Sequence, residues 1–160
     1  MRLHKREVKD PKVLNRILQT CDVVRIGCQD EEGIFVVPVN FGYEYDGDHE
    51  LKIYFHSATE GRKAAAFDLG PSVAFEMDYE TGLIRGDYTC SYSMGYCSIM
   101  GNGKISKLEK YEDKIKGLTL LMNHLAPDAG IHFKDGMLEK VNIYCIEADT
   151  FTGKMREPKE

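Results

Sequence analysis

The chain has 160 residues and a formal net charge of −5 at pH 7, and its sequence pI is about 5.6. Hydrophobic residues make up 42% and charged residues 29% of the chain, which is typical of a globular protein with a real core and not of a disordered one. The acidic balance argues against a general nucleic-acid or anionic-membrane binder, because such proteins carry a basic surface.

Targeting signals and cysteine spacing also limit where the protein can be located and whether it can bind a metal. No run of about 18 apolar residues occurs, so we expect no transmembrane helix and no membrane partner. The N-terminal segment 1–7 lacks the apolar centre of a signal peptide, which favours the cytoplasm. The five cysteines show no CxxC spacing and no Cys/His cluster. They predict reduced, mostly buried thiols and no metal site.

The first third of the chain predicts a helix followed by a hairpin. Asp10-Pro11 is a good helix start, and apolar residues at helical spacing continue the helix to Thr20. Strands are expected over 23–29 and 34–43, joined by a polar turn.

Pro38 interrupts the second of these strands. Because proline lacks the N–H that pairs in a sheet, it marks an edge, a bulge or a break. Backbone groups near it would then be free to meet a ligand, although a simple bulge is an equally ordinary explanation.

The rest of the chain adds strands and two helices. We expect a strand over 51–55, a helix over 63–68, a strand over 72–78, a polar excursion over 79–90, a strand over 92–106, a helix opened by a capping box at 106–109, a strand over 141–148 and a frayed tail over 154–160. About six strands joined mostly by short turns favour an antiparallel sheet or barrel with helices at its ends.

The segment from Leu51 to Lys63 is the most informative. Its apolar, β-prone run ends in His56 and Ser57, and Arg62 and Lys63 then open a helical segment. Free backbone N–H groups and two cations at a helix start can hold an anion such as phosphate. An ordinary strand, turn and helix with solvated charges gives the same pattern. His56 beside this site is either a structural histidine or a donor or proton relay to a ligand.

The other motifs in the sequence give little indication of function. Gly101-Asn-Gly103 has no third glycine and no following helix, so it fits a bent strand better than a dinucleotide loop. There is no GxSxG motif, and nothing in the sequence places a histidine beside Cys90 or Cys97 for cysteine catalysis.

Three blocks in order resemble the FMN-binding split-barrel superfamily that contains pyridoxamine 5′-phosphate oxidase. They are Val36–Phe41, similar to a "PVNF" strand; Ile53–Lys63, similar to "YFHxAxxGxK"; and Cys90–Gly103, similar to "C…Y-x-SV-x-G-x-G". The second block is the most specific, and the third departs only in Ile99, where valine is usual. Among the branches, the chain most resembles the 5-nitroimidazole-resistance (Nim) flavoproteins.

The resemblance implies a mainly β fold with helices: a six-stranded antiparallel FMN-binding split barrel with peripheral helices. It would fill 1–160 as a single domain, with its core over about 6–152 and a charged tail over 153–160. The expected protein is a homodimer with FMN at the subunit interface. It would act as an oxidoreductase on a small aromatic or nitro compound.

The resemblance also implies which residues bind the cofactor. The flavin ring would lie along the strand 37–40, and Ser57, Arg62 and Lys63 would hold the phosphate. Phe55 and His56 would line the ring and substrate pocket, with His56 in contact with the substrate. The remaining candidates approach the cofactor or the dimer interface. The full cofactor-binding set is Val37, Pro38, Val39, Asn40, Phe55, His56, Ser57, Arg62, Lys63, Tyr96, Ser98 and Met100.

Other functions stay open at this point. One is a flavin- or haem-binding protein without turnover, used for storage, sensing or electron carriage, and another is a haem-degrading split barrel. Haem is therefore the alternative cofactor. Oxidation of pyridoxamine phosphate itself is disfavoured, because the segment 147–160 does not resemble the substrate-phosphate segment of that enzyme.

Overall fold

The computed structural model describes residues 4–134 and 136–157. Its helices are α1 (Pro11–Thr20), α2 (Arg62–Asp68) and α3 (Tyr111–Leu125), with 3-10 turns η1 (His4–Arg6) and η2 (Thr89–Ser91). Its strands are β1 (Glu7–Val8), β2 (Val23–Asp30), β3 (Gly33–Asn40), β4 (Gly42–Tyr45), β5 (Leu51–Ala58), β6 (Ser72–Ile84), β7 (Ser93–Lys107) and β8 (Val141–Arg156). None of the helices in the described part of the chain is long and apolar enough to span a membrane.

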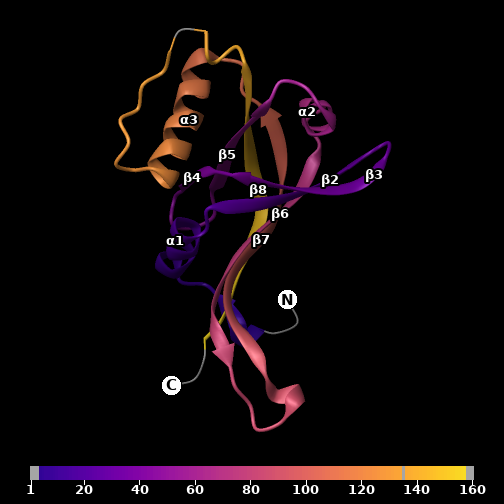
Figure 1. Cartoon of the computed structure of the whole chain (residues 1–160), viewed down its shortest axis with the longest axis vertical. Helices are drawn as coiled ribbons and strands as arrows, with labels where there is room; N and C mark the ends of the chain where they lie inside the picture. Colours follow the sequence, from indigo (N-terminus) through magenta and orange to yellow (C-terminus); the bar gives the residue numbers. More distant parts are fainter. Residues whose placement is uncertain (1–3, 135, 158–160) are drawn as a thin grey trace.

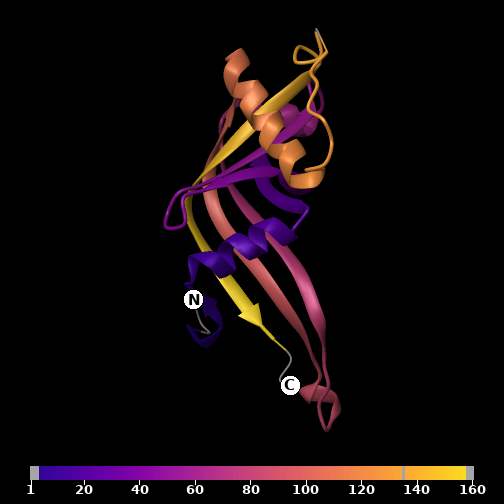
Figure 2. The same cartoon turned by 90° about the vertical axis from the view of Figure 1, so that its left-hand side faces the viewer.

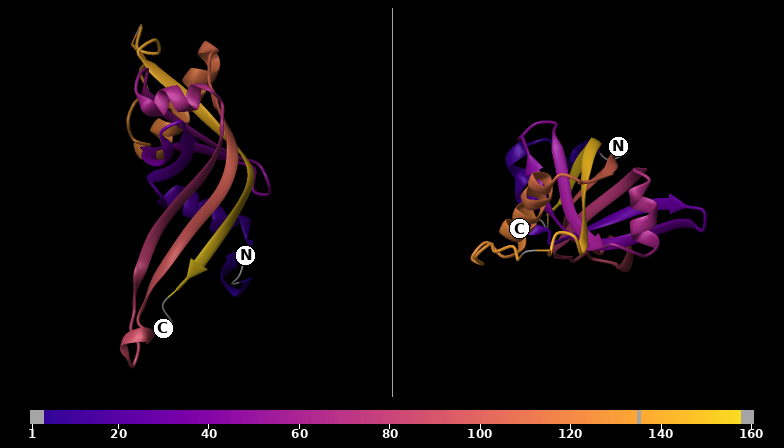
Figure 3. Two further views of the ribbon diagram at one scale, coloured as in Figure 1. Left: turned by 90° about the vertical axis from the view of Figure 1, so that its right-hand side faces the viewer. Right: turned by 90° about the horizontal axis from the view of Figure 1, so that it is seen from above.

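All the strands belong to one antiparallel sheet in the order β3-β2-β6-β7-β8-β5-β4, with β1 added beside β8. The long strands β6, β7 and β8 curve along the length of the molecule, and β6 and β7 continue as a two-stranded arm (Figure 1). Helix α1 lies across these strands (Figure 2). Seen from above, the β2–β3 hairpin projects sideways beside α2 (Figure 3).

This architecture confirms the predicted antiparallel split-barrel fold with peripheral helices, but the sheet has eight strands and is not closed. The expected six are present, β1 is a short addition, and β4 arises because one predicted strand is divided in two. The strand predicted over 34–43 divides at Phe41 and not at Pro38. Phe41 is fully buried, with its ring 4.9 Å from that of His124, so the chain turns inward there. Pro38 stays in register opposite Arg25, because an edge strand tolerates a missing outward N–H.

Several predicted boundaries were wrong because long-range pairing overrides local polarity. The excursion expected over 79–90 is strand as far as Ile84, where Leu83 pairs with Met94. The tail expected to fray from residue 154 is strand as far as Arg156. The capping box expected at Ser106 does not form, since Ser106 pairs with Cys145 and α3 begins only at Tyr111.

The glycines predicted to lie in a bent strand do so. The register of β7 against β8 shifts between Asn102 and Gly103. A Cβ atom on Gly101 would lie 2.4 Å from the ring of Phe75, so this position in the sheet has no room for a side chain.

An aromatic cluster of Phe35, Phe55, Phe67 and Tyr144 holds α2 on the sheet. The ring of Phe67 lies 5.8 Å from Phe55, 5.7 Å from Tyr144 and 6.3 Å from Phe35. A seven-residue helix is too short to be stable alone, so its position depends on this packing.

A polar contact on the neighbouring residue, at the C-terminal end of α2, adds to the anchor. The Tyr144 hydroxyl donates to Asp68 at 2.6 Å, and Lys107 Nζ lies 3.1 Å from the same carboxylate. Burial and this hydrogen bond raise the pKa of Tyr144, which keeps the phenol protonated and able to donate. The helix that carries Arg62 and Lys63 is therefore fixed to the sheet at its C-terminal end.

Candidate functional site

Two strand edges are left open on either side of α2. Within the described chain, β3 pairs only with β2, and β5 pairs with β4 only over Leu51–Tyr54, so Phe55–Ala58 pair with β8 alone. The two strands lie side by side, and each leaves a row of backbone N–H and C=O groups outside the strand ladder. We call the space between Gly33–Asn40 and Phe55–Ala58 the split.

Arg62 ties α2 to the β2–β3 turn across the split. Its Nε and one terminal nitrogen each donate to Asp30 at 2.7 Å, and it also donates to the carbonyl of Gly33 at 3.3 Å. The guanidinium lies 4.7 Å from the centre of the Phe35 ring. Hydrogen bonds from Arg62 hold the pKa of Asp30 below its ordinary value of 3.8. Asp30 was not a predicted site residue, and its place in a polar turn gave no signal of this pairing.

The other two residues predicted to hold a phosphate differ from Arg62. Lys63 is half-buried and has no hydrogen bond or ion pair within the described part of the chain, so its charge is available to an anion. Ser57 is buried, and its hydroxyl donates to the carbonyl of Ala58 at 3.1 Å. The three predicted residues lie in consecutive elements, but only Lys63 carries an uncommitted polar group.

Strand alternation separates Phe55 from His56. The Phe55 ring is 1% exposed and stacks on Tyr144 at 5.4 Å, so it belongs to the core. His56 points to the other face of β5, where it is exposed and lines a pocket against α3. A ligand in the split can therefore meet the backbone of both residues, but only the His56 side chain leaves the core.

The predicted ring-binding segment, Val37 to Asn40, forms the end of the open edge of β3. Val39 is buried, Val37 is half-buried, and Pro38 and Asn40 are exposed. The Asn40 amide donates to the carbonyl of Asp22 at 2.9 Å. What this strand offers a ligand is mainly its backbone, as the proline suggested.

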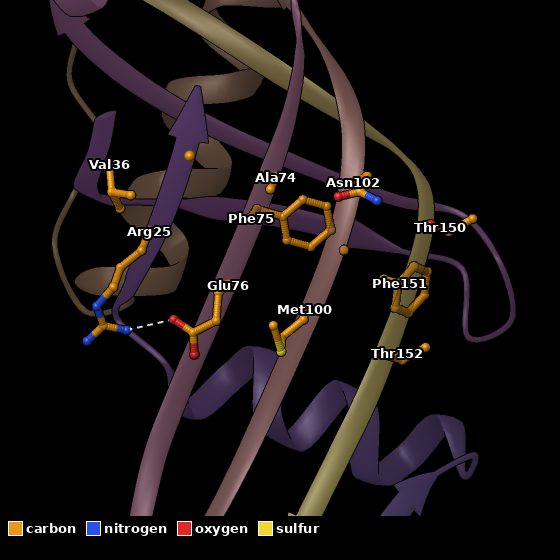
Figure 4. Close-up of a pocket in the computed structure, with 12 residues that line it drawn as sticks. Arg25, Val36, Ala74, Phe75, Glu76, Met100, Asn102, Thr150, Phe151 and Thr152 are labelled. Atoms are coloured by element: carbon orange, nitrogen blue, oxygen red, sulfur yellow. Dashed lines mark hydrogen bonds and ion pairs between the residues drawn. The ribbon is translucent and has the colours of Figure 1, made fainter. Parts of the chain in front are cut away.

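Tyr96, Ser98 and Met100 share one face of β7, opposite Cys97 and Ile99, but Ser98 is buried and Tyr96 is half-buried, so only Met100 is exposed. Met100 is 56% exposed and lies in a shallow hollow of about 510 Å³ on the side of the sheet away from the core (Figure 4). We call this surface the outer face. Arg25, Val36, Ala74, Glu76 and Thr152 also belong to the outer face.

Comparison with known proteins identifies the family of the chain. The profile of the pyridoxamine 5′-phosphate oxidase family matches residues 10–155. The chain belongs to this family. No match was found among curated proteins.

Solved structures agree with the family assignment. A candidate 5-nitroimidazole antibiotic resistance protein from Bacteroides thetaiotaomicron is 30% identical, with a TM-score of 0.79 over 93% of this chain and 86% of that one. The flavocytochrome Anf3 from Azotobacter vinelandii is 20% identical, with a TM-score of 0.81 over 99% and 73% of the two chains. An FAD and haem binding protein from Mycobacterium smegmatis is 15% identical, with a TM-score of 0.84 over 97% and 76%. The last two show the fold alone, and the resemblance found in the sequence is confirmed for the family and the fold.

The Arg62–Asp30 pair predicts a pH-dependent contribution to stability. A carboxyl whose pKa is lowered in the folded state stabilises the fold above its unfolded pKa, and this contribution is lost as the pH falls through the folded pKa. Asp30→Asn should therefore lower the denaturant midpoint at pH 6 and 7, and the gap from wild type should close as the pH falls below about 4.

The matched control is Glu32→Gln, because Glu32 is exposed and 3.7 Å from Arg62 and should contribute little. Urea unfolding followed by circular dichroism at each pH measures both gaps. Equal midpoints for wild type and Asp30→Asn at pH 7, or a gap that persists at low pH, would contradict the role of the pair.

Proposed function

We propose that the protein is an FMN-dependent oxidoreductase that reduces a small aromatic or nitro compound at a flavin held in the split. One observation carries the proposal: among the described residues, the split is bordered by two open strand edges and has at one end a cation, Lys63, without a hydrogen bond or ion pair. The edges offer backbone donors and acceptors, and the cation offers a place for a phosphate.

A flavin suits these edges for a chemical reason. The polar pyrimidine side of the ring carries both donors and acceptors, which match the alternating N–H and C=O groups of the β3 edge. When bound, FMN supplies two-electron transfer, and the protein supplies binding, orientation and electrostatics. Backbone N–H groups beside the ring would stabilise negative charge on the reduced cofactor. This requires no catalytic triad of side chains.

The phosphate is assigned to Lys63 first and to Arg62 second. Two donors of Arg62 already bind Asp30, so an incoming phosphate meets a guanidinium whose charge is partly neutralised. Lys63 has no such competitor within the described chain. Arg62 then acts mainly by holding α2 and the β2–β3 turn together, and Lys63 supplies most of the attraction for the phosphate.

His56 is the residue assigned to substrate contact. Its exposed imidazole is the side chain that leaves the core at the open half of β5. An imidazole can donate or accept one hydrogen bond in its neutral form and donate two when protonated. A haem-binding role is the second candidate, because His56 and His132 line the same pocket and one structural neighbour is named an FAD and haem binding protein.

We also propose that a second copy of the chain covers the outer face. Val36 is 62% and Met100 56% exposed, which gives this face an apolar centre. Arg25 lies 3.0 Å from Glu76, so both charge signs occur on the same patch. A two-fold interface requires such a self-complementary surface. Val36 also belongs to β3, so this interface would adjoin the split.

Replacing Lys63 tests the cofactor site. Lys63→Ala should weaken FMN binding about 10- to 100-fold, which corresponds to about 1.5–3 kcal/mol for a lost charge-assisted hydrogen bond. Its unfolding midpoint should stay near that of wild type, since the amine makes no hydrogen bond or ion pair within the described chain. Titration of the apoprotein with FMN by flavin fluorescence measures the affinity.

Asp30→Asn is the control for this titration, because it releases the Arg62 guanidinium without removing a cation. FMN should bind to it as tightly as to wild type or more tightly. If Lys63→Ala binds FMN as tightly as wild type does, the phosphate does not bind at Lys63.

Replacing Met100 tests the interface. Met100→Glu should convert a dimer into a monomer at micromolar concentration, because it places a charge at the apolar centre of the outer face. Tyr111→Glu is the control, since Tyr111 is 64% exposed at the start of α3, outside this face. Sedimentation velocity gives the mass of each. A monomeric wild type, or a variant that stays dimeric, would exclude the outer face as the interface.

A further inference from the structure

The strands β6 and β7 extend beyond the rest of the sheet as a two-stranded arm, which we define as residues 82–95 (Figure 1). Within the described chain, β2 pairs with β6 only over Ala74–Glu76, and β8 pairs with β7 only from Tyr96 onward. The arm therefore has no third strand beside it. Because a two-stranded ribbon is marginally stable at best on its own, an ordered arm needs a further surface to pack against.

The arm carries large apolar and aromatic side chains that are exposed to solvent: Leu83, Tyr88, Tyr92 and Met94. Leu83 and Met94 are direct cross-strand partners. At the tip, the N–H of Tyr88 donates to the hydroxyl of Ser91 at 3.1 Å, and this hydroxyl donates to the carbonyl of Tyr88 at 2.5 Å. The tip is thus a formed surface, and a contiguous exposed apolar surface of this kind marks an interaction site.

We infer that the arm clasps a second copy of the chain and lies on the exposed side of the β2–β3 hairpin of that copy. The inference rests on the two-fold interface proposed above for the outer face. It does not depend on the cofactor.

Strand alternation places the arm and the hairpin on the same side of the sheet. Along β7, Met94 lies on the same side as Met100, and its partner Leu83 shares that side. On β3, Val36 lines the hollow of the outer face, and Ile34, two positions earlier, points the same way. Ile34 is 79% exposed. The outer face therefore has Met100 near its middle and an apolar surface at each of two ends.

A two-fold axis can join these two ends. Suppose that two copies pack outer face to outer face about an axis that lies in the interface and crosses the line from hairpin to arm. Each arm then faces the hairpin of the other copy, and each contact occurs twice. An axis along that line would instead set arm against arm and hairpin against hairpin.

Charge distinguishes these two arrangements. The β2–β3 turn carries three carboxylates in a row, at 30–32, and one cation, Arg62, binds to this turn. Hairpin against hairpin would bring two acidic turns together, which is unfavourable. The arm has no such excess, because it carries one cation, Arg85, and one anion, Asp87. Arg85 directly follows β6 and is exposed, so an arm laid on the hairpin brings this cation toward the acidic turn.

The arrangement also bears on the split. Because β3 is one border of the split, an arm that lies on Ile34 and Val36 of the other copy adjoins that border. Tyr88 and Tyr92 at the tip then provide aromatic surface beside the candidate site of the other chain. Each site is therefore completed by the arm of the partner.

Cysteine crosslinking tests the contact. Cys90 is exposed at the tip of the arm, and the other four cysteines are buried. Ile34→Cys adds a thiol on the β2–β3 hairpin, which lies far from the arm tip of the same chain (Figure 1). A short bismaleimide should join Cys90 of one chain to the introduced thiol of the other. Denaturing gels should show a covalent dimer, and mass spectrometry of its peptides should identify the joined pair.

Two controls exclude the other arrangements. Wild type, which has the tip thiol alone, should give no covalent dimer. Ile34→Cys combined with Cys90→Ser, which has the hairpin thiol alone, should also give none. A covalent dimer of wild type would place arm beside arm, and one in the double variant would place hairpin beside hairpin. Either result would overturn the inference.

Charges on the apolar side of the arm test its contribution to the dimer. Leu83→Lys combined with Met94→Lys should weaken dimerisation at least about tenfold, because exposed apolar surface that becomes buried at an interface does not tolerate a charge. Tyr111→Lys is the control and should leave the dimer unchanged, since Tyr111 is exposed at the start of α3, away from the arm. Sedimentation velocity over a range of concentrations measures both.

The outcomes separate this inference from the proposed function. A dimeric wild type with no product between Cys90 and the introduced thiol would overturn the inference and leave the outer face as the interface. A monomeric wild type would overturn both. The expected product from a protein that fails to bind FMN would support the arm contact and disprove the proposed cofactor.

Discussion

The packing of Phe67 into the aromatic cluster is the interaction on which the candidate site depends. It joins β3, α2 and β5, three elements that the strand pairing of the sheet leaves unconnected at this place. With Phe67 buried, a seven-residue helix is held across the open edges, and its first residues, Arg62 and Lys63, lie at the end of the split. Neither cation has a defined position without this anchor, because so short a helix has little stability of its own.

Side chains along β5 alternate between two faces of the strand, and the two faces have different roles in the site. Phe55 and Ser57 face the core and keep the strand in place, whereas His56 faces the pocket against α3. A ligand along the edge of this strand would meet backbone on one side and a substrate held by His56 on the other. The same separation applies to the two cations, since Arg62 is paired with Asp30 and Lys63 is free within the described chain. In both segments, therefore, one residue stabilises the fold and its neighbour in the sequence is left to bind a ligand.

Local patterns predicted much of this arrangement, and long-range contacts account for what they missed. The helix start at Asp10-Pro11 is confirmed by the Asp10 side chain, which accepts from the N–H of Lys12. The proline in β3 correctly indicated free backbone. The sequence predicted that Arg62 binds a phosphate, but it could not identify Asp30 as a partner of Arg62. The two residues lie 32 positions apart in the chain. Sequence reasoning likewise missed the pocket against α3 that His56 lines, because the other walls of this pocket come from α3 and the following segment and share no local motif.

The absorption spectrum of the freshly purified protein, with the mass of the cofactor released from it, tests the central claim most directly. The account predicts the bands of an oxidised flavin and the mass of FMN, released at one per chain. A Soret band would instead assign the chain to haem. A colourless protein that also fails to bind added FMN would contradict the claim that the open edges of β3 and β5, with Lys63 beside them, form a flavin site.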